Sequence, residues 1–228
     1  MPPISNIICC VFGKTGVGKS TLTNYAINKE YQIKRRGGIV ILDHKEDHKN
    51  LLKYQDFVRL PITDRIFNNY NLDWKGILKE YPYIIVEPIK LSRDEYEKLA
   101  DDIAGGLIEV ENRVYVIEEA QLAFPVHGSI RRSLSVLVTT GRKIGIDLYF
   151  TSQRPAMCNS VAVSQSNIRI CFAVDDLVDL KRTSTYFSGV ELEKLKRFQF
   201  VCKNTMNHKQ IVGSTSDLSV VDEVIWGK

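Results

Sequence analysis

The chain has 228 residues, of which 44% are hydrophobic and 25% are charged, and its formal net charge at pH 7 is +4. These fractions exclude a disordered or low-complexity chain, and a domain of this length buries a sizeable core without disulfides or structural metals. The small positive charge permits a polyanionic partner such as nucleic acid but does not require one.

The cysteine and hydropathy patterns favour one soluble, cytoplasmic domain over residues 1–228. The cysteines are odd in number and show no CxxC spacing: Cys9, Cys10, Cys158, Cys171 and Cys202. Several lie in apolar runs, where a thiol acts as a small hydrophobic group, so neither a zinc site nor a disulfide framework is expected. The N-terminus lacks the positive head of a signal peptide, and no apolar run reaches the ~18 residues of a membrane-spanning helix.

Short apolar runs alternate with longer amphipathic segments along the chain. The runs that predict buried strands are rich in Ile, Val, Phe and Tyr and cover residues 7–12, 38–43, 83–87, 114–118, 146–152, 168–174 and 198–202. The segments that predict helices between them are 19–28, 92–105, 130–140 and 176–187. Strands that alternate with helices indicate an α/β fold with a mostly parallel central sheet flanked by helices.

Two further segments complete the prediction. Residues 210–212 are expected to add an antiparallel edge strand after a turn at 204–207. Residues 44–80 are polar and show no clear period. We therefore expect them to form an irregular insertion at the edge of the sheet.

The strongest motif is G-x-x-x-x-G-K-[ST] at residues 13–20, between a predicted strand and a predicted helix. In such a phosphate loop, backbone N–H groups turn toward an anion and the helix N-terminus adds its positive dipole. Lys19 is expected to pair with the β- and γ-phosphates of ATP, and Ser20 to bind Mg²⁺. The expected nucleotide-binding residues are Gly13, Lys14, Thr15, Gly16, Val17, Gly18, Lys19, Ser20 and Thr21.

Lys14 allows a second interpretation of the loop. It resembles the additional lysine of the deviant phosphate loops of partition-type ATPases, but that pattern continues Lys-Gly-Gly, whereas this loop has Thr15 and Gly16 after Lys14. Lys14 is therefore expected to decorate the loop rather than to act in catalysis. A chance glycine-rich turn is the alternative for the whole motif.

Two carboxylates, Glu118 and Glu119, follow directly on the apolar run 114–117. This pattern is typical of phosphoryl transfer, in which the first acid holds Mg²⁺ through water and the second activates the attacking water. The usual first acid is Asp, so the longer Glu118 is expected to reach the metal shell differently. The alternative is that both glutamates only cap an exposed strand end.

Gln153 ends the strand predicted at 146–152, which we expect beside the phosphate-loop strand. A neutral amide at that place can hydrogen-bond the γ-phosphate or the attacking water and so report whether ATP is intact. A surface glutamine without a role is the alternative.

The run from Asp43 to His48 contains two histidines four residues apart, His44 and His48. They would share one face only in a helix, but no apolar stripe supports a helix and no third ligand is evident. A loop is therefore expected rather than a metal site. Asp43 ends a strand that we interpret as the neighbour of the phosphate-loop strand, so it is expected near the loop.

With one further block, these motifs resemble the FtsK–HerA superfamily of DNA-pumping ATPases. The block reads G-R-K-I-G-I-D-L at 141–148 and T-S-Q-R-P at 151–155. It looks like the family's glycine-arginine helix end followed by a strand that ends in Gln-Arg-Pro. Residues 167–170 and 179–183 resemble the next strand and helix. The likeness covers residues 5–203 and implies a RecA-like P-loop NTPase.

The resemblance also implies roles for single residues. It assigns phosphate binding to Lys19 and the metal to Ser20 and Glu118. Glu119 would be the catalytic base and Gln153 the sensor. Such motors form hexameric rings in which an arginine reaches the γ-phosphate of a neighbouring subunit. Arg142 is the first candidate for an arginine that acts on phosphate and Arg182 the second, in the same subunit or in its neighbour.

The implied function is ATP-driven movement of double-stranded DNA without readout of its sequence. The membrane helices and winged-helix module of FtsK and the accessory barrel of HerA do not fit in 228 residues. The chain therefore resembles the minimal genome-packaging ATPases of membrane-containing viruses, and a capsid or portal-site protein would be a partner.

Basic clusters are candidates for DNA contacts around a ring pore, where they would neutralise phosphates without reading bases. They lie at residues 34–36, 131–132, 142–143, 181–182 and 194–197. A scattered solvated surface explains single pairs equally well.

Two rival functions stay open. E-E-A-Q-L-A-F-P at 118–125 resembles the Zot-like ATPases of filamentous-phage assembly, which act on protein and normally carry a membrane helix that we do not find. The other rival is a non-motor nucleotide switch with slow turnover, against which Arg142 and Gln153 count. DNA-stimulated turnover together with ring formation distinguishes the three.

Overall fold

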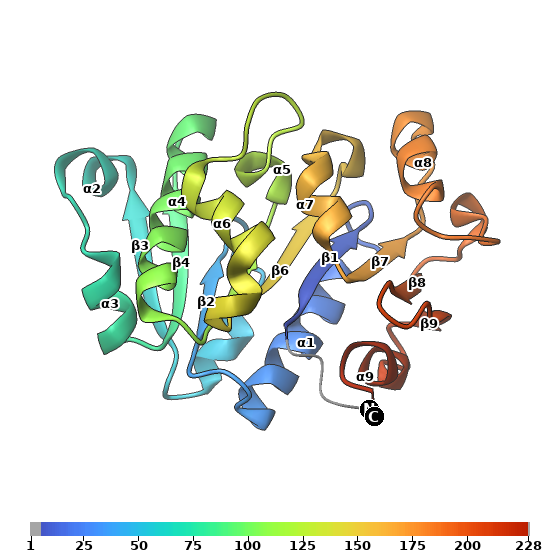
Figure 1. The fold of residues 1–228 in the computed structure, drawn as a ribbon, viewed down its shortest axis with the longest axis horizontal. Coiled ribbons are helices and arrows are strands. Elements are labelled where there is room, and N and C mark those ends of the chain that lie inside the picture. Colours follow the sequence, from blue (N-terminus) through green and yellow to red (C-terminus); the bar gives the residue numbers. More distant parts are fainter. Residues whose placement is uncertain (1–5, 228) are drawn as a thin grey trace.

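The computed structural model describes residues 6–227 and shows a nine-stranded sheet between two layers of helices (Figure 1). The strand order across the sheet is β3-β4-β2-β5-β6-β1-β7-β8-β9. In chain order the strands are β1 (Ile8–Phe12), β2 (Ile39–Leu42), β3 (Val58–Thr63), β4 (Tyr83–Ile89), β5 (Val114–Ile117), β6 (Asp147–Ser152), β7 (Ile168–Phe172), β8 (Gln199–Asn204) and β9 (Gln210–Ser214). The prediction that no signal peptide is present rests partly on residues 1–5, which lie outside the described residues.

The burial of the interior strands explains why the sequence predicts them well. β1, β2 and β5 are buried along their whole length, and strands covered on both faces read as continuous apolar runs. The pairs among β1 to β7 are all parallel, whereas β8 pairs antiparallel with β7 and β9 pairs antiparallel with β8. The predicted α/β class and the antiparallel edge strand are therefore confirmed.

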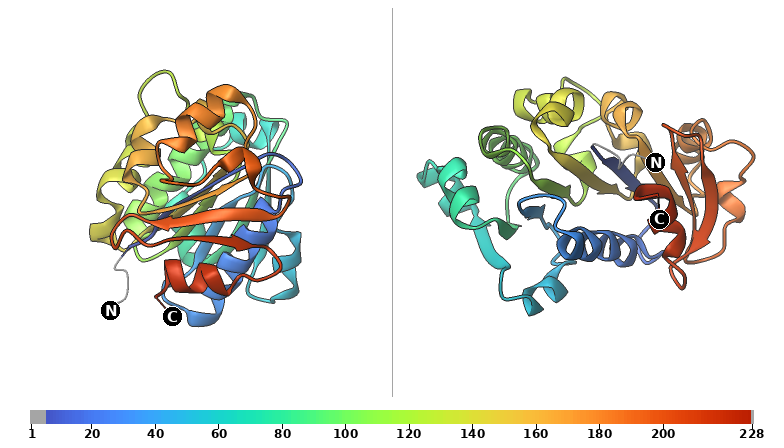
Figure 2. Two further views of the ribbon diagram at one scale, coloured as in Figure 1. Left: turned by 90° about the vertical axis from the view of Figure 1, so that its right-hand side faces the viewer. Right: turned by 60° about the horizontal axis from the view of Figure 1, so that its bottom comes forward.

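The helices cover both faces of the sheet (Figure 2). They are α1 (Lys19–Ile33), α2 (Asp64–Asn69), α3 (Trp74–Glu80), α4 (Arg93–Val110), α5 (Ala120–Ala123), α6 (Arg132–Thr140), α7 (Ser160–Gln165), α8 (Leu177–Ser184) and α9 (Ser219–Ile225). α1 and α9 pack on one face, and α4, α6 and α7 on the other. Within the described part of the chain, none of these helices has the length and apolar character needed to cross a membrane.

The segment 44–80 corrects the sequence prediction. It lies at the edge of the sheet, as expected, but it is regular: a short 3₁₀ helix, η1 (Lys49–Lys53), precedes β3, α2 and α3. β3 pairs with β4 over its whole length and is mostly exposed. Because it is an exposed edge strand that carries Arg59 and Pro61, its sequence shows neither an apolar run nor a clean alternation.

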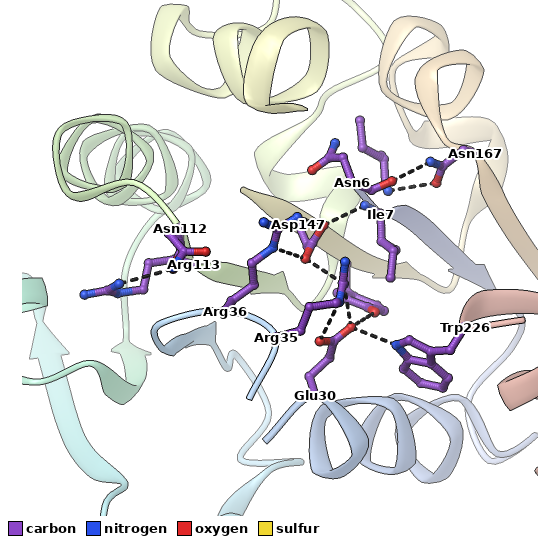
Figure 3. A network of polar contacts seen from close by, with 12 residues as sticks. Asn6, Ile7, Glu30, Arg35, Arg36, Asn112, Arg113, Asp147, Asn167 and Trp226 are labelled. Carbon is purple, nitrogen blue, oxygen red and sulfur yellow. Dashed lines mark hydrogen bonds and ion pairs between the residues drawn. The ribbon is translucent and has the colours of Figure 1, made fainter. Parts of the chain in front are cut away.

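At the amino ends of the parallel strands, buried charges hold several elements together (Figure 3). Asp147, fully buried at the start of β6, accepts the backbone N–H of Ile7 at 2.6 Å. It also accepts Arg36 Nε at 2.6 Å and Arg35 Nη2 at 2.7 Å, and Arg35 Nη2 in turn donates to Glu30 at 2.8 Å. Buried charges are tolerated when they are paired in this way.

The same network reaches the C-terminal helix. Glu30 of α1 accepts the indole N–H of Trp226, just after α9, at 3.1 Å and the hydroxyl of Tyr149 at 2.8 Å. The network therefore joins β1, β6, the end of α1 and the end of α9 at the amino ends of the parallel strands. The opposite edge, at the carboxyl ends of the strands, is left to the phosphate loop.

Candidate active site

The phosphate loop leaves β1 at its carboxyl end and leads into α1 at Lys19. Gly13 and Gly18 have φ angles of 150° and 107°, a region that L-residues rarely adopt. A Cβ on Gly13 would lie 2.7 Å from Cβ of Phe172, and one on Gly18 would lie 2.7 Å from Cγ2 of Thr215. Glycine is therefore required at both positions by conformation and by space.

The two residues expected to bind phosphate and metal start the helix. Lys19 Nζ folds back over the loop and donates to the carbonyl oxygen of Lys14 at 2.7 Å. Burial lowers the pKa of Lys19 below its ordinary value, although Glu119 and Glu118 oppose that shift. The Ser20 hydroxyl donates to Oδ2 of Asp47 at 2.9 Å.

Glu118 and Glu119 lie at the carboxyl end of β5 and are both buried, but they have different partners. Glu118 accepts the hydroxyl of Thr151 and contacts His48 Nε2 at 2.8 Å. Burial opposes a charge on His48, yet the hydrogen bond to Glu118 and the charge of that carboxylate raise the pKa of the imidazole.

Glu119 is turned away from the strand by a left-handed backbone, with φ 52°. Non-glycine residues in this conformation are uncommon and gather at functional sites. Its carboxylate contacts Lys45, Gln121 and Gln153. Burial alone would raise the pKa of Glu119, but these three contacts hold it below its ordinary value.

Gln153 follows β6, and β6 pairs with β1, so the predicted neighbourhood of this strand and the phosphate loop is confirmed. Its side chain contacts both parts of the site, because Nε2 donates to Glu119 while Oε1 accepts the hydroxyl of Thr15. The amide thus connects the phosphate loop to the second carboxylate.

The segment between β2 and η1 supplies side chains that the sequence prediction missed. Asp43 is buried and accepts the backbone N–H groups of Lys45, Asp47 and His48 at 3.2, 3.0 and 2.9 Å. These bonds fold the loop so that Lys45 meets Glu119, Asp47 meets Ser20 and His48 meets Glu118. A signal was present, since the segment follows the carboxyl end of a parallel strand, where ligands bind in open α/β sheets.

Two interpretations of this segment have different outcomes. The stated reason for placing Asp43 near the phosphate loop is wrong, because β5 and β6 separate β2 from β1. Asp43 acts instead through the loop that its carboxylate organises. The expected loop at 44–48 is confirmed, with His44 against the ring of Tyr96 and His48 turned to Glu118.

Around these residues lies a cavity of about 350 Å³. Its lining includes Lys19, Ser20, Glu118, Glu119 and Gln153, together with Thr15, Gly16, Gly18, Thr21, Lys45, Asp47 and Phe198. Gly13, Lys14 and Val17 are not among the lining residues: Val17 packs into the core, and Lys14 is exposed and pairs with Asp175. The hydroxyl of Ser20 and the carboxylates beside it are oxygen donors of the kind that Mg²⁺ prefers, so the donor set fits this metal.

The structure brings neither predicted arginine into this cavity. Arg142 lies in a short 3₁₀ helix, η2 (Gly141–Ile144), at the amino end of β6. The carbonyl oxygen of Ile144 accepts the N–H of Asn112, just before β5, so Arg142 and the phosphate loop lie at opposite ends of the strands. Arg182 of α8 donates to the carbonyl oxygen of Cys158 at 3.0 Å.

Two of the basic clusters contain arginines that pair with carboxylates of the same chain. Arg35 and Arg36 are bound to Asp147, and Arg131 pairs with Asp94 and Glu97 at 2.6 and 3.2 Å. Arg35 and Arg36 therefore have a structural role in this chain, and side chains only 19% and 12% exposed leave little surface for DNA phosphates. Other basic residues of the clusters are exposed, among them Arg132, Lys143, Lys181, Lys196 and Arg197.

A match to a family model identifies the protein family to which this chain belongs. The model of the central domain of the helicase HerA matches residues 8–141, from β1 through the carboxylates to the end of α6. The chain belongs to the HerA central-domain family. It is thus a P-loop ATPase of the FtsK–HerA type, in agreement with the resemblance in the sequence. No curated protein matches it in sequence.

Solved structures share the fold of this HerA-type domain. The genome-packaging NTPase B204 of Sulfolobus turreted icosahedral virus 2, in complex with sulfate, is 19% identical over 92% of this chain and 97% of its own, with a TM-score of 0.71. VirB4 of Thermoanaerobacter pseudethanolicus is 12% identical over 92% and 89%, with a TM-score of 0.68. A bacterial conjugative coupling protein, TrwB, is 10% identical over 90% and 83%, with a TM-score of 0.66. B204 has also been solved with ATP-gammaS.

Proposed function

We propose that this HerA-type domain hydrolyses ATP and uses the energy to move double-stranded DNA, as a packaging motor does. The observation that carries the proposal is the convergence of Lys19, Ser20, Glu118, Glu119 and Gln153 on one cavity at the carboxyl edge of the sheet. The name of B204, a genome-packaging NTPase of the same fold, supports the choice of DNA as the substrate.

In the proposed reaction, Lys19 pairs with the β- and γ-phosphates and Glu119 takes a proton from the attacking water. The water oxygen bonds to the γ-phosphorus as the bond to the β-phosphate oxygen breaks, and ADP leaves. Ser20, Glu118 and Asp47 would hold Mg²⁺, which neutralises charge on the phosphates. Gln153 positions the water through its amide.

Phe198 is proposed to receive the purine. Its ring lies at the edge of the cavity, is 41% exposed and carries the guanidinium of Arg197 at 4.7 Å from its centre. An exposed aromatic ring beside a phosphate loop offers a base a flat apolar surface. Adenine recognition is otherwise unassigned in this chain.

The first test is a matched pair of measurements on Glu119→Gln. The variant is expected to bind Mg²⁺ and ATP as the unchanged protein does but to hydrolyse it at least about 100-fold more slowly, because the general base is lost. Equilibrium titration with ATP and steady-state phosphate release measure the two. Turnover at the unchanged rate would contradict the proposed mechanism.

The second test addresses DNA. Steady-state hydrolysis by the unchanged protein is expected to rise with long double-stranded DNA and to lose that stimulation as salt increases, because phosphate contacts weaken with ionic strength. A ring, hexameric by our proposal, should be visible by sedimentation under the same conditions. Hydrolysis indifferent to DNA would point to an assembly motor that acts on protein, and slow turnover without a ring would point to a nucleotide switch.

A further inference from the structure

Lys45 holds the proposed catalytic base in the structure. It lies in the loop between β2 and η1, and its Nζ contacts Oε1 of Glu119. The shape of that loop comes from the backbone bonds to Asp43 and not from the side chain of Lys45. Lys45 is therefore placed at the cavity by the fold, while its own side chain remains 43% exposed.

Both oxygens of the Glu119 carboxylate are engaged in this arrangement, and Oε1 has two partners. Oε1 contacts both Lys45 and the amide of Gln153, and Oε2 contacts the amide of Gln121. A base that accepts a proton from water needs a free lone pair directed at that water, and the contacts with Lys45 and Gln153 occupy those of Oε1.

A phosphoryl group in the cavity could replace Glu119 as the partner of Lys45. Lys19 and Lys45 line the same cavity, together with Glu118 and Glu119. A terminal phosphoryl group offers three charged oxygens, more than a carboxylate already shared with amides. Charge-assisted bonds to such a group are among the strong hydrogen bonds of proteins.

We infer that Lys45 is a second lysine for the terminal phosphate of ATP, and that it leaves Glu119 when a nucleoside triphosphate enters the cavity. The base is then released only when a phosphoryl group is present to be attacked. ADP has no γ-phosphate and leaves Lys45 on Glu119. This inference rests on the proposed ATPase function and assigns nucleotide discrimination to one residue.

A purely structural ion pair is the competing explanation for this contact. Half-exposed ion pairs contribute little to stability, and the loop is shaped by Asp43, so a structural pair could be removed with no effect on nucleotide choice. A lysine for the terminal phosphate has a different consequence: its loss weakens the binding of triphosphates and spares diphosphates.

The experiment compares two ligands, ATPγS and ADP, by calorimetric titration with Mg²⁺. Lys45→Met is expected to weaken ATPγS binding at least about tenfold, which is the effect of a lost charge-assisted bond. ADP binding should weaken less than about twofold, because ADP has no terminal phosphate for Lys45 to contact. Lys45→Arg, which keeps the charge, should recover most of the affinity for ATPγS. The matched control is Lys49→Met, which removes an exposed lysine of the neighbouring η1 that pairs with Glu46 outside the cavity, and it should change neither ligand.

Lys19→Ala separates the two proposals. If Lys19→Ala binds both nucleotides as tightly as the unchanged protein, the proposed function itself fails. If it weakens both nucleotides while Lys45→Met leaves the ratio of the two affinities unchanged, only the role of Lys45 is overturned. Lys45→Gln replaces Lys45→Met if that variant does not fold, and the same ratio decides.

Discussion

The two ends of the parallel strands both carry clusters of charged residues, but the clusters differ in how their charges are compensated. At the amino end, Asp147 and Glu30 are buried and are paired with Arg35 and Arg36, whose own side chains are mostly covered. At the carboxyl end, Lys45 is half exposed beside a cavity that it shares with Lys19 and several carboxylates.

The difference shows what separates a structural cluster from a site. The amino-end charges are compensated by partners within the chain, so their removal affects folding. The carboxyl-end lysines rest on partners that a phosphate could replace, namely the Lys14 carbonyl oxygen and the Glu119 carboxylate. Charge that can exchange partners is the property that ligand binding requires.

The largest effect is expected at Arg142, which tests whether the amino end of the strands has only a structural role. It lies at the amino end but is predicted to act on phosphate, and from there it cannot reach the cavity of its own chain. We expect Arg142→Ala to lower DNA-stimulated hydrolysis about 1000-fold, the effect of a lost arginine finger, while ATP binding by the single chain stays unchanged.

Mixing of variants identifies the subunit on which Arg142 acts. In rings that contain both Arg142→Ala and Glu119→Gln chains, some sites combine an intact Glu119 with an intact Arg142 from the neighbour. Phosphate release by the mixture should exceed that of either variant alone. An inactive mixture of properly formed rings would contradict action in trans, and Arg182→Ala would then be the next variant to test.

Asp147 tests the structural side of the comparison. Asp147→Asn removes the buried carboxylate that pairs with Arg36 and one of the two that pair with Arg35, which is expected to cost about 3 kcal/mol of the free energy of unfolding. Urea titration measures the loss. Glu109→Gln, which removes an exposed ion pair with Lys75, is the control and should have a far smaller effect. At low denaturant, the folded Asp147→Asn protein should bind ATPγS normally, and a parallel loss of affinity would show that the two clusters are coupled.

The fold could be predicted where burial is uniform and not where it is one-sided. The interior strands β1, β2 and β5 are continuous apolar runs, so their sequence alone identifies them. The edge strand β3 has an exposed, charged sequence whose regularity comes from pairing with β4, a contact between separate parts of the chain. Local sequence does not contain that information.

The candidate site divides in the same way. Lys19, Ser20 and Glu118 belong to contiguous motifs with a recognisable spacing, so the sequence identified them as candidates. Lys45, Asp47 and His48 belong to a loop without any period, and they reach the cavity only because the carboxylate of Asp43 binds three of its N–H groups. The position of the loop after a parallel strand indicates a ligand-binding segment, but which of its side chains reach the cavity is set by the tertiary contacts of Asp43.

Phe198 gives the smallest expected effect and sharpens the description of the carboxyl end. If its ring receives the purine, Phe198→Ala should weaken ATPγS and ADP equally, by about fivefold, the size of one aromatic stacking contact. Equal loss is the opposite of the pattern expected for Lys45→Met, so the two variants separate recognition of the base from recognition of the terminal phosphate. Phe198→Tyr keeps the ring and should bind both nucleotides normally. Unchanged binding of both ligands by Phe198→Ala would remove this ring from the nucleotide site, and the exposed position at the cavity edge would then need another explanation.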